Sequence, residues 1–404
     1  MTPESELLER LCETIRTRGP ITFREFMERA LYEPDFGYYA TAHRAIGRQG
    51  DFFTNVSVGP LFGGLLARQI VEIWERLDRP KPFHLVEQGA HHGQLMADIV
   101  RSLRGFAPAL AESVECVMVE PQPHLRAVQK TTLAELTKPT WVNSPRDLPL
   151  FTGLHFSNEL VDAFPVHRVV CRDNEWLEQH VGCRNDHLVF EDGAISSSEL
   201  VAAVNRLGPR PNGYETEINL AAAPWIRAVA AQMVRGAVLV IDYGFAHETN
   251  YELARHRGTL QARGSHRLVE NPLSNPGQID LTAHVDFTHL AEAGLEAGLD
   301  LAGFTDQHHF LVGLSRAHFR EGAIPDGQEA RAFQTLMHPT LLGRAFMVLA
   351  MTRGLNLTSP LLGFAFGGDA RRHLGLGTPA CGAETRRSPN SGPDAEDRGV
   401  TSAR

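Results

Sequence analysis

The sequence contains few cysteines, and they are dispersed. Cys12, Cys116, Cys171, Cys183 and Cys381 form no CxxC pair. An odd, scattered set is typical of free thiols in a reducing compartment, and it does not suggest a disulfide framework. We therefore expect free thiols.

Long apolar runs are also missing. No stretch approaches the roughly 18–20 apolar residues that span a bilayer. The first residues, MTPESELLERL, are acidic and amphipathic, so they have neither the apolar core of a secretory signal nor the Arg-rich, acid-poor composition of a transit peptide. We expect a cytoplasmic protein without membrane insertion.

Basic residues are outnumbered: 39 Lys and Arg stand against 48 Asp and Glu, for a net charge of −9. Because a nucleic-acid backbone requires a basic face, nucleic acid is not expected as the main partner. The hydrophobic content of 43% is ordinary for a globular protein, and 404 residues suffice for one large α/β domain with additions or for two domains. The sequence does not determine the oligomeric state.

Two other classes of site lack their usual motifs. The chain has 19 histidines, but no HExxH motif and no Cys-His cluster, so no metal site is predicted. The adjacent pairs His91–His92 and His308–His309 would diverge on any regular element. The nucleophile elbow GxSxG of many serine hydrolases is also missing.

Apolar periodicity divides the chain into segments. Residues 1–80 are expected to be mainly helical, with a first helix that stops at Gly19, a second over ITFREFMERALY and a third over 61–77. From Lys81 to about 366, short apolar runs alternate with amphipathic helices, which predicts an α/β fold with a mostly parallel sheet and crossover helices.

Three further segments have their own patterns. Residues 166–193 alternate and contain turn pairs, which predicts an antiparallel insert. A helix is expected over roughly 217–235, ahead of the buried strand GAVLVIDYG. From about Gly367 to 404 the composition shifts to Gly, Pro, Ser, Arg and Asp, which is typical of a disordered tail.

A glycine-containing turn follows the expected strand FHLV, in the order Glu87-Gln88-Gly89-Ala90-His91-His92-Gly93. Glycines allow the backbone to bend and to approach a ligand, and the N-terminus of the next helix presents free N–H groups. An ordinary tight turn is the simple alternative. Glu120 ends the next strand about thirty residues later, where an acid can bind ribose hydroxyls or simply be solvated.

The two motifs together favour a nucleotide-type cofactor, because their spacing is that of a βαβ unit. The sequence lacks GxGxxG, and the first motif begins with the acid Glu87, as methyltransferase motifs often do. This favours S-adenosyl-L-methionine over NAD.

A third motif, Ser157-Asn158-Glu159-Leu160-Val161-Asp162, leaves a strand at its carboxyl end. Two carboxylates beside an amide can hold a guanidinium through charge-assisted hydrogen bonds. A helix cap plus a surface acid is the alternative. His284 precedes an expected helix, and it could be either a core or capping histidine or an active-site residue near the substrate.

The ordered fragments ITFREFMERALYEPDFGYY, GDFFTNVS, EQGAHHGQLMADI, NELVDAFPVHRV, VIDYG, GTL and DLTAHVDF resemble the MidA family between about residues 10 and 366. This resemblance implies a class I, Rossmann-like methyltransferase core that uses S-adenosyl-L-methionine. It also implies symmetric dimethylation of an arginine in a respiratory complex I subunit.

The resemblance also suggests roles for residues. The cofactor-binding candidates are Glu87, Gly89, Gly93, Glu120, Gly50 and Asp51, the last two from a GDF element that would fold over the cofactor. The catalytic candidates are Asn158, Glu159, Asp162 and His284, and the family's DYG element corresponds to Asp242, Tyr243 and Gly244. His91 stands where the family's ELGPGRG-like motif has its middle glycine, and Asn55-Val56 replaces a Ser-Pro pair.

The sequence therefore predicts methyl transfer from S-adenosyl-L-methionine to an arginine guanidinium of a partner protein. Glu159 is the first candidate for contact with the guanidinium. Two alternatives stay open. Because of His91, the chain could be an assembly chaperone that retained the fold without the transfer step, and it could also be a small-molecule methyltransferase.

Overall fold

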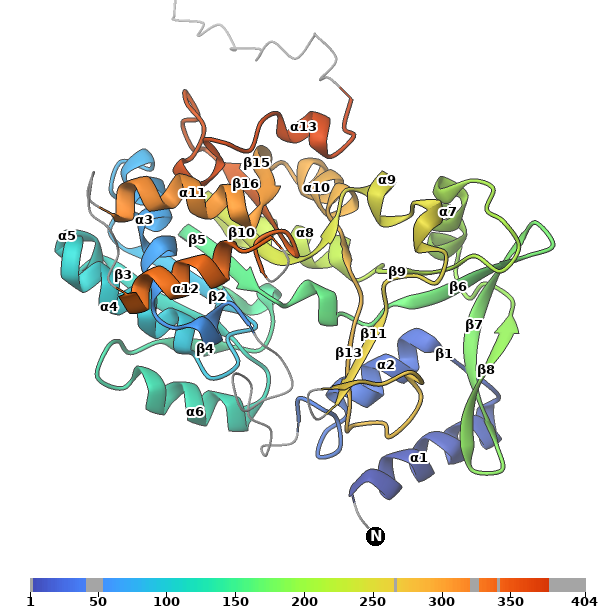
Figure 1. Ribbon diagram of the computed structural model, residues 1–404. Coiled ribbons are helices and arrows are strands. Elements are labelled where there is room, and N and C mark those ends of the chain that lie inside the picture. Colours follow the sequence, from blue (N-terminus) through green and yellow to red (C-terminus); the bar gives the residue numbers. More distant parts are fainter. Residues whose placement is uncertain (1–2, 41–53, 265–266, 320–326, 340–341, 378–404) are drawn as a thin grey trace, which may run out of the picture.

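A computed structural model describes residues 3–40, 54–264, 267–319, 327–339 and 342–377. Two units lie side by side in Figure 1: a large central sheet with helices on both faces, and a smaller unit built from the N-terminal helices and a separate antiparallel sheet.

The central sheet confirms the predicted α/β class. Its main path runs β15-β16-β10-β5-β2-β3-β4, and β14 pairs with β10. Neighbouring strands from β4 to β10 are parallel, whereas β16 is antiparallel to both β10 and β15. The strands are β2 Phe83–Gln88, β3 Val114–Val119, β4 Thr140–Val142, β5 Phe151–Asn158, β10 Met233–Phe245, β14 Val285–Asp286, β15 Asp300–Asp306 and β16 Phe346–Arg353.

Helices cover both faces of this sheet because successive strand residues point to opposite sides. Leu85 belongs to the apolar cluster under one set of helices, and Val86 belongs to the cluster under the other. The first set includes α3 Leu61–Arg76, α4 Gln94–Phe106, α11 Gln307–His318 and α12 Gly327–Met337, and the second includes α8 Ala222–Gln232 and α10 Phe287–Glu296. The helices α5 Pro108–Ala111 and α6 Pro123–Leu133 flank β3 in the chain. The strand ends are thus fixed by a sheet that is buried on both faces.

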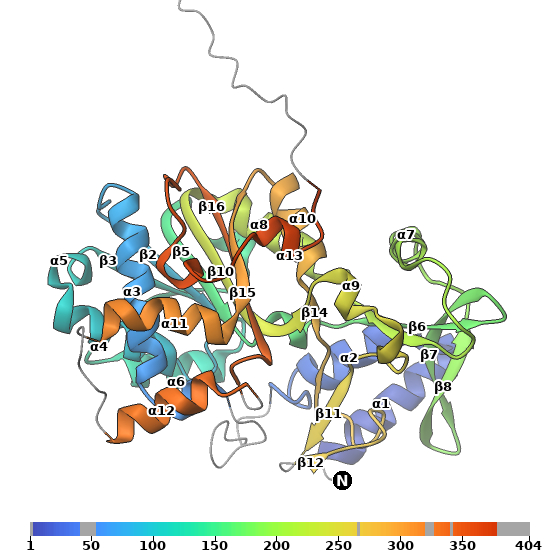
Figure 2. The same cartoon turned by 45° about the horizontal axis from the view of Figure 1, so that its top comes forward.

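The smaller unit contains the predicted antiparallel insert. Its sheet has the order β1-β7-β6-β9, with β8 on β7, and β11 pairs separately with β12 and β13. The bounds are β1 Ile21–Thr22, β6 His167–Arg172, β7 Glu175–Arg184, β8 His187–Gly193, β9 Glu215–Ile218, β11 Gln261–Gly264, β12 Arg267–Leu268 and β13 Asp280–Thr282. Figure 2 shows this unit beside the carboxyl end of the central sheet.

The helical N-terminal segment is divided between the two units. Helices α1 Pro3–Arg18 and α2 Phe23–Tyr32 share an apolar cluster with β7, β11 and β13, whereas α3 packs on the central sheet. Ile21 and Thr22, expected in a helix, pair with β7 instead. Residues 215–218 form β9, so the helix predicted from about 217 begins only at Ala222; α7 Ser198–Leu207 precedes both.

The prediction of free thiols was wrong for one pair. Cys12 in α1 and Cys183 in β7 form a disulfide although 171 residues separate them in the chain. Sequence spacing did not reveal this pair because only the packing of α1 on β7 brings the two residues together. Cys116 and Cys171 are free and buried.

The predicted tail also needs correction. Residues 367–377 belong to the folded body: α13 Ala370–His373 follows Asp369, and Leu374 is buried against the second apolar cluster. Thr288 anchors it by donating a hydrogen bond to the Leu374 carbonyl. Residues 378–404 lie outside the described residues. Among the described helices, none is long and apolar enough to cross a membrane.

Candidate active site

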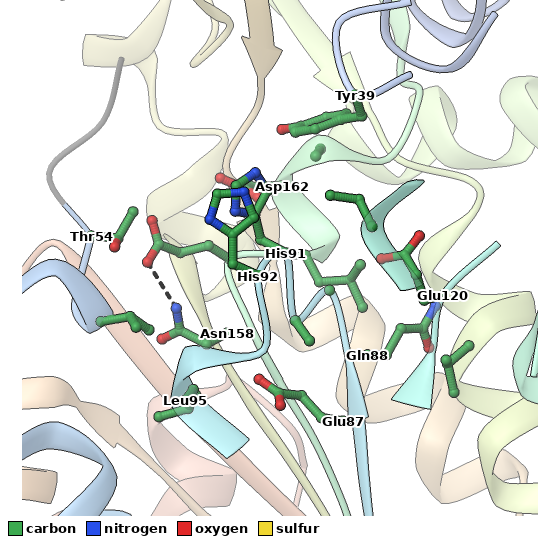
Figure 3. A pocket seen from close by; sticks show the side chains of 18 of the residues that line it. Tyr39, Thr54, Glu87, Gln88, His91, His92, Leu95, Glu120, Asn158 and Asp162 are labelled. Atoms are coloured by element: carbon green, nitrogen blue, oxygen red, sulfur yellow. Dashed lines mark hydrogen bonds between the residues drawn. The ribbon is translucent and has the colours of Figure 1, made fainter. Parts of the chain in front are cut away.

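A cavity of about 510 Å³ opens at the carboxyl ends of β2, β3 and β5. This volume lies within the range of roughly 300–1,000 Å³ that is usual for small-molecule sites. Figure 3 shows side chains from separate segments converging on it, among them Tyr39, Glu87, Glu120 and Asn158. The cavity therefore lies at the strand ends where open α/β sheets bind their ligands.

The turn after β2 forms the floor of one half of the cavity. Gly89 has φ +78°, and a Cβ there would lie 3.1 Å from Leu160 Cδ1, so a side chain at this position would be both strained and crowded. Gly93, also at φ +78°, is the N-cap of α4 and is not one of the lining residues that the structure describes. Its role is to turn the chain into the helix.

His91 has the left-handed φ of +45° and lines the cavity. Its ring lies 3.8 Å from that of His92, centroid to centroid. The expected divergence on a regular element does not apply here, because the pair lies in an irregular turn and not on a helix or strand. Burial lowers the pKa of His91 to about 3, so its imidazole is neutral and would not repel a cationic cofactor.

Glu120 follows β3, and its buried carboxylate is held by two donors. Oε1 accepts the backbone N–H of Gln122 at 2.9 Å, and Oε2 accepts Gln129 Nε2 at 3.3 Å. The Trp141 indole N–H donates to Gln129 Oε1 and thereby fixes the orientation of that amide. A carboxylate held in this way retains lone pairs for two hydroxyl groups of a ribose.

The surroundings of Glu87 indicate whether a cationic cofactor fits the cavity. Its side chain is buried and lines the cavity, and Oε2 has no hydrogen-bond partner within the described structure. Burial raises its pKa to about 8. Because a buried carboxylate oxygen without a partner is costly, a cationic ligand in this half of the cavity would stabilise it. The residues present thus fit S-adenosyl-L-methionine, which carries a sulfonium and an ammonium group.

Glu159 lines the other half of the cavity. Its backbone has the left-handed φ of +56°, and its Oε1 accepts Asn158 Nδ2 at 2.8 Å (Figure 3). Desolvation raises the pKa of Glu159 to about 8, and the charge of Asp242 adds to the increase. A residue held in this sparsely populated conformation is common at functional sites.

Three further carboxyl groups lie close to Glu159. Asp162 and Asp280 line the same cavity, and Asp242 lies beneath them. Burial and the neighbouring negative charges raise the pKa of Asp162 well above its usual value. Asp242 accepts three backbone N–H groups, those of Leu160, Val161 and Tyr243, at 2.8–3.1 Å. We call Glu159, Asp162, Asp242 and Asp280 the carboxyl cluster.

The smaller unit supplies part of this half. The Tyr39 hydroxyl lies 2.9 and 3.0 Å from the two carboxyl oxygens of Asp280 in β13, and the Tyr32 hydroxyl donates to the Ala163 carbonyl. Sequence reasoning missed Asp280, although it begins the fragment DLTAHVDF. It also assigned Tyr39 no place in the site, because nothing local indicates that α2 and β13 meet here.

The remaining predicted residues fall elsewhere. His284 is not among the described lining residues; its ring is nearly parallel to that of Tyr243, which does line the cavity, at 6.5 Å. Burial lowers the pKa of His284 to about 4. His284 thus supports a wall of the cavity. Gly50 and Asp51 lie outside the described residues.

The sheet order, the glycine turn and the acid after the second strand define the class of the protein: a Rossmann-like methyltransferase. The family profile described as "Putative S-adenosyl-L-methionine-dependent methyltransferase" matches residues 65–305. The chain belongs to this family of S-adenosyl-L-methionine-dependent methyltransferases, and the MidA resemblance is confirmed.

A solved relative supports the cofactor. The crystal structure of a Burkholderia thailandensis protein bound to S-adenosyl-homocysteine is 31% identical, covers 92% of this chain and 97% of that one, and superposes with a TM-score of 0.81. S-adenosyl-homocysteine is what remains of S-adenosyl-L-methionine after methyl transfer, so the predicted cofactor is confirmed.

Relatives from animals carry more specific names. "Protein arginine methyltransferase NDUFAF7 homolog, mitochondrial" of Drosophila melanogaster is 29% identical over 89% of this chain and 88% of its own length. The Xenopus tropicalis protein of the corresponding name is 30% identical over 78% and 76%. These relatives are mitochondrial, and this finding contradicts the expected cytoplasmic location.

Proposed function

We propose that this methyltransferase acts on an arginine guanidinium of a partner protein. The observation that carries the proposal is the carboxyl cluster, of which Glu159, Asp162 and Asp280 line the same cavity as the cofactor turn. The strongest charges acting on Glu159 and Asp162 are those of other carboxylates. A cationic acceptor would relieve this repulsion, whereas a neutral acceptor would not.

A guanidinium is a poor nucleophile because its nitrogen lone pairs are delocalised and its pKa exceeds about 12. Glu159 and Asp162 would hold it by bidentate, charge-assisted hydrogen bonds and turn one nitrogen toward the cofactor half. S-adenosyl-L-methionine supplies an electrophilic methyl group on a sulfonium. As the nitrogen–carbon bond forms and the carbon–sulfur bond breaks, the Glu159 carboxylate would accept the proton that the nitrogen loses.

The cofactor roles belong to the same proposal. Glu120 would bind the ribose hydroxyls, Gly89 would allow close approach of the backbone, and Glu87 would face the cationic part of the cofactor. Gly93 would contribute indirectly, by placing the N-terminus of α4. The names of the animal relatives support the acceptor class, and the MidA resemblance supports a respiratory complex I subunit as the partner protein.

The test is Glu159→Gln, which preserves size but removes the proton acceptor. Methylarginine in complex I subunits is measured by mass spectrometry in cells that lack the protein and are complemented with parental or variant chains. We expect the parental chain to restore methylation and the variant to lose it at least 100-fold. By calorimetry, the variant should bind S-adenosyl-L-methionine within about threefold of the parental Kd, since Glu159 lies in the other half.

Glu115→Gln is the matched control, because Glu115 is an exposed glutamate on β3. It should behave like the parental chain in both measurements. Methylation by Glu159→Gln at the parental rate would refute the role of Glu159. If complementation by the parental chain restores no methylarginine, the arginine proposal itself is wrong.

A further inference from the structure

Behind Glu159, a row of side-chain amides leads away from the cavity. Asn158 Oδ1 accepts Asn55 Nδ2 at 3.1 Å, and Asn55 Oδ1 accepts Gln307 Nε2 at 2.8 Å. Gln307 Nε2 also donates to the Leu336 carbonyl at 3.1 Å. Asn55 and Gln307 are fully buried, and neither is among the described residues that line the cavity.

The direction of every hydrogen bond in this row is determined at one end. A backbone carbonyl can only accept, so Leu336 requires Gln307 to present its NH₂ group. That NH₂ also meets Asn55, which must therefore turn its oxygen toward Gln307 and its NH₂ toward Asn158. Asn158 in turn must accept with its oxygen and offer its own NH₂ to Glu159. The orientation of these amides follows from the network and does not depend on distinguishing nitrogen from oxygen.

The row joins four segments that are distant in sequence. Leu336 lies in α12, Gln307 is the first residue of α11, Asn55 precedes the 3₁₀ turn Val56–Val58, and Asn158 ends β5. Thr54 and Val56, on either side of Asn55, line the cofactor cavity. The backbone N–H of Asn55 also donates to Glu159. The same short segment therefore both lines the cavity and contacts Glu159.

We infer that Gln307 is a positioning residue which, through the side-chain amides of Asn55 and Asn158, holds the Glu159 carboxylate in the orientation that receives the acceptor. This inference rests on the proposed function for the identity of the acceptor. The row presents an N–H donor to Glu159, and a donor bonds more strongly to the ionised carboxylate than to the neutral acid, so the row favours the charged form of Glu159 against the desolvation that opposes it. The other titratable groups facing Glu159 are Asp242, Asp162 and Asp280, with Tyr243 beside them.

The experiment measures the pH titration of the Glu159 carboxyl group directly, by NMR. The full-length protein is labelled with [δ-¹³C]glutamate, and the Glu159 signal is assigned by its loss in Glu159→Gln. Gln307→Met keeps the approximate size of the side chain and removes the donors. We expect it to raise the titration midpoint of Glu159 by about 0.5–1 pH unit, because the last amide in the row is no longer held. The pH profile of methyl transfer should shift in the same direction.

Gln69→Met is the matched control. Gln69 is also a fully buried glutamine, and it lies in α3, which packs against α11. Its side-chain amide donates a hydrogen bond to the Glu72 carboxylate and accepts one from the Gly363 N–H, and Gln69 is not among the described residues that line the cavity. This variant should lower stability comparably and leave the Glu159 titration unchanged. If Gln307→Met does not fold, Asn55→Ser interrupts the same row one link nearer to Glu159 and should give the same shift.

An unchanged Glu159 midpoint in Gln307→Met, or an equal shift in Gln69→Met, would overturn the inference. Neither result depends on the acceptor, since the titration is read without one. Failure of the arginine proposal is detected separately, as absence of methylarginine with the parental chain. A shifted midpoint in a protein that methylates no arginine would thus support the positioning role and reject the acceptor class.

Discussion

The two halves of the cavity differ in how the chain builds them. The glycine turn and Glu120 of the cofactor half come from one stretch, residues 87–122, in which a strand, a turn, a helix and a second strand follow one another. The other half, around Glu159, is called the acceptor half, and distant segments form it. Its residues Tyr39, Asn158, Asp242 and Asp280 come from both units of the fold. A shared cofactor can be bound by a local βαβ unit, whereas selection of the acceptor depends on tertiary packing.

The halves also differ in charge. In the cofactor half, two donors hold the Glu120 carboxylate, and Glu87 is buried with one carboxyl oxygen that has no partner within the described structure. In the acceptor half, like charges are placed together and Glu159 has a left-handed backbone. Such an arrangement costs stability in the ligand-free protein, and it is retained where function requires it. Four predictions test how independent the halves are.

The largest effect is expected for Glu120→Ala. Loss of two charge-assisted hydrogen bonds to the ribose should weaken S-adenosyl-L-methionine binding about 100-fold. Calorimetry gives this Kd, and binding of agmatine, an alkylguanidinium probe, should change less than twofold. Glu115→Ala, on the same strand but exposed, is the control. A comparable loss of agmatine affinity would show that the halves are coupled.

The acceptor half is tested with Asp280→Asn. Removal of one negative charge from the carboxyl cluster should weaken agmatine binding about tenfold, because a guanidinium loses the attraction of one nearby carboxylate. Asn retains the shape and can still hydrogen bond to Tyr39. S-adenosyl-L-methionine affinity, measured on the same sample, should stay within twofold. If the cofactor Kd changes more than the agmatine Kd, Asp280 does not belong to the acceptor half.

The stability of the ligand-free protein should depend on pH because each half of the cavity contains a buried glutamate with a raised pKa. Glu87 and Glu159 have pKa values of about 8 in the folded chain, above the ordinary value of 4.5. Between these values the folded state binds more protons than the unfolded state, so stability falls as the pH rises through this window. Calorimetric Tm should decrease by several degrees from pH 5.5 to 8.5. Glu159→Gln should make Tm depend less steeply on pH. An unchanged slope of Tm against pH in this variant would contradict the raised pKa of Glu159.

The smallest effect is expected for His91→Gly. Glycine adopts a φ of +45° without strain, so the free energy of unfolding should rise by about 0.5–1 kcal/mol. Removal of a ring that lines the cavity should also tighten cofactor binding a few-fold. Urea denaturation and calorimetry measure the two effects. Weaker cofactor binding in this variant would show that the imidazole contacts the ligand.

Sequence reasoning predicted the central fold and two strand ends that line the cavity. Alternation between strands and helices indicated the parallel sheet, and the spacing from Glu87 to Glu120 indicated two strand ends that the structure places beside one cavity. It failed where residues meet only in three dimensions. The Cys12–Cys183 disulfide is one such case, and the contact of Tyr39 with Asp280 is another.

The sequence by itself determined the class of fold and the cofactor, and it indicated Glu159 and Asp162 as candidate residues that the structure places in the cavity, because hydrophobic period and short motifs are local properties of the chain. Tertiary structure alone decided that Asp242 and Asp280 join them, that His284 stands behind Tyr243 and that Gln307 connects to Glu159. The physical reason is the separation along the chain over which each interaction acts. Strand and helix patterns depend on residues a few positions apart. Burial, repulsion between carboxylates and amide networks depend on segments that only tertiary packing brings together.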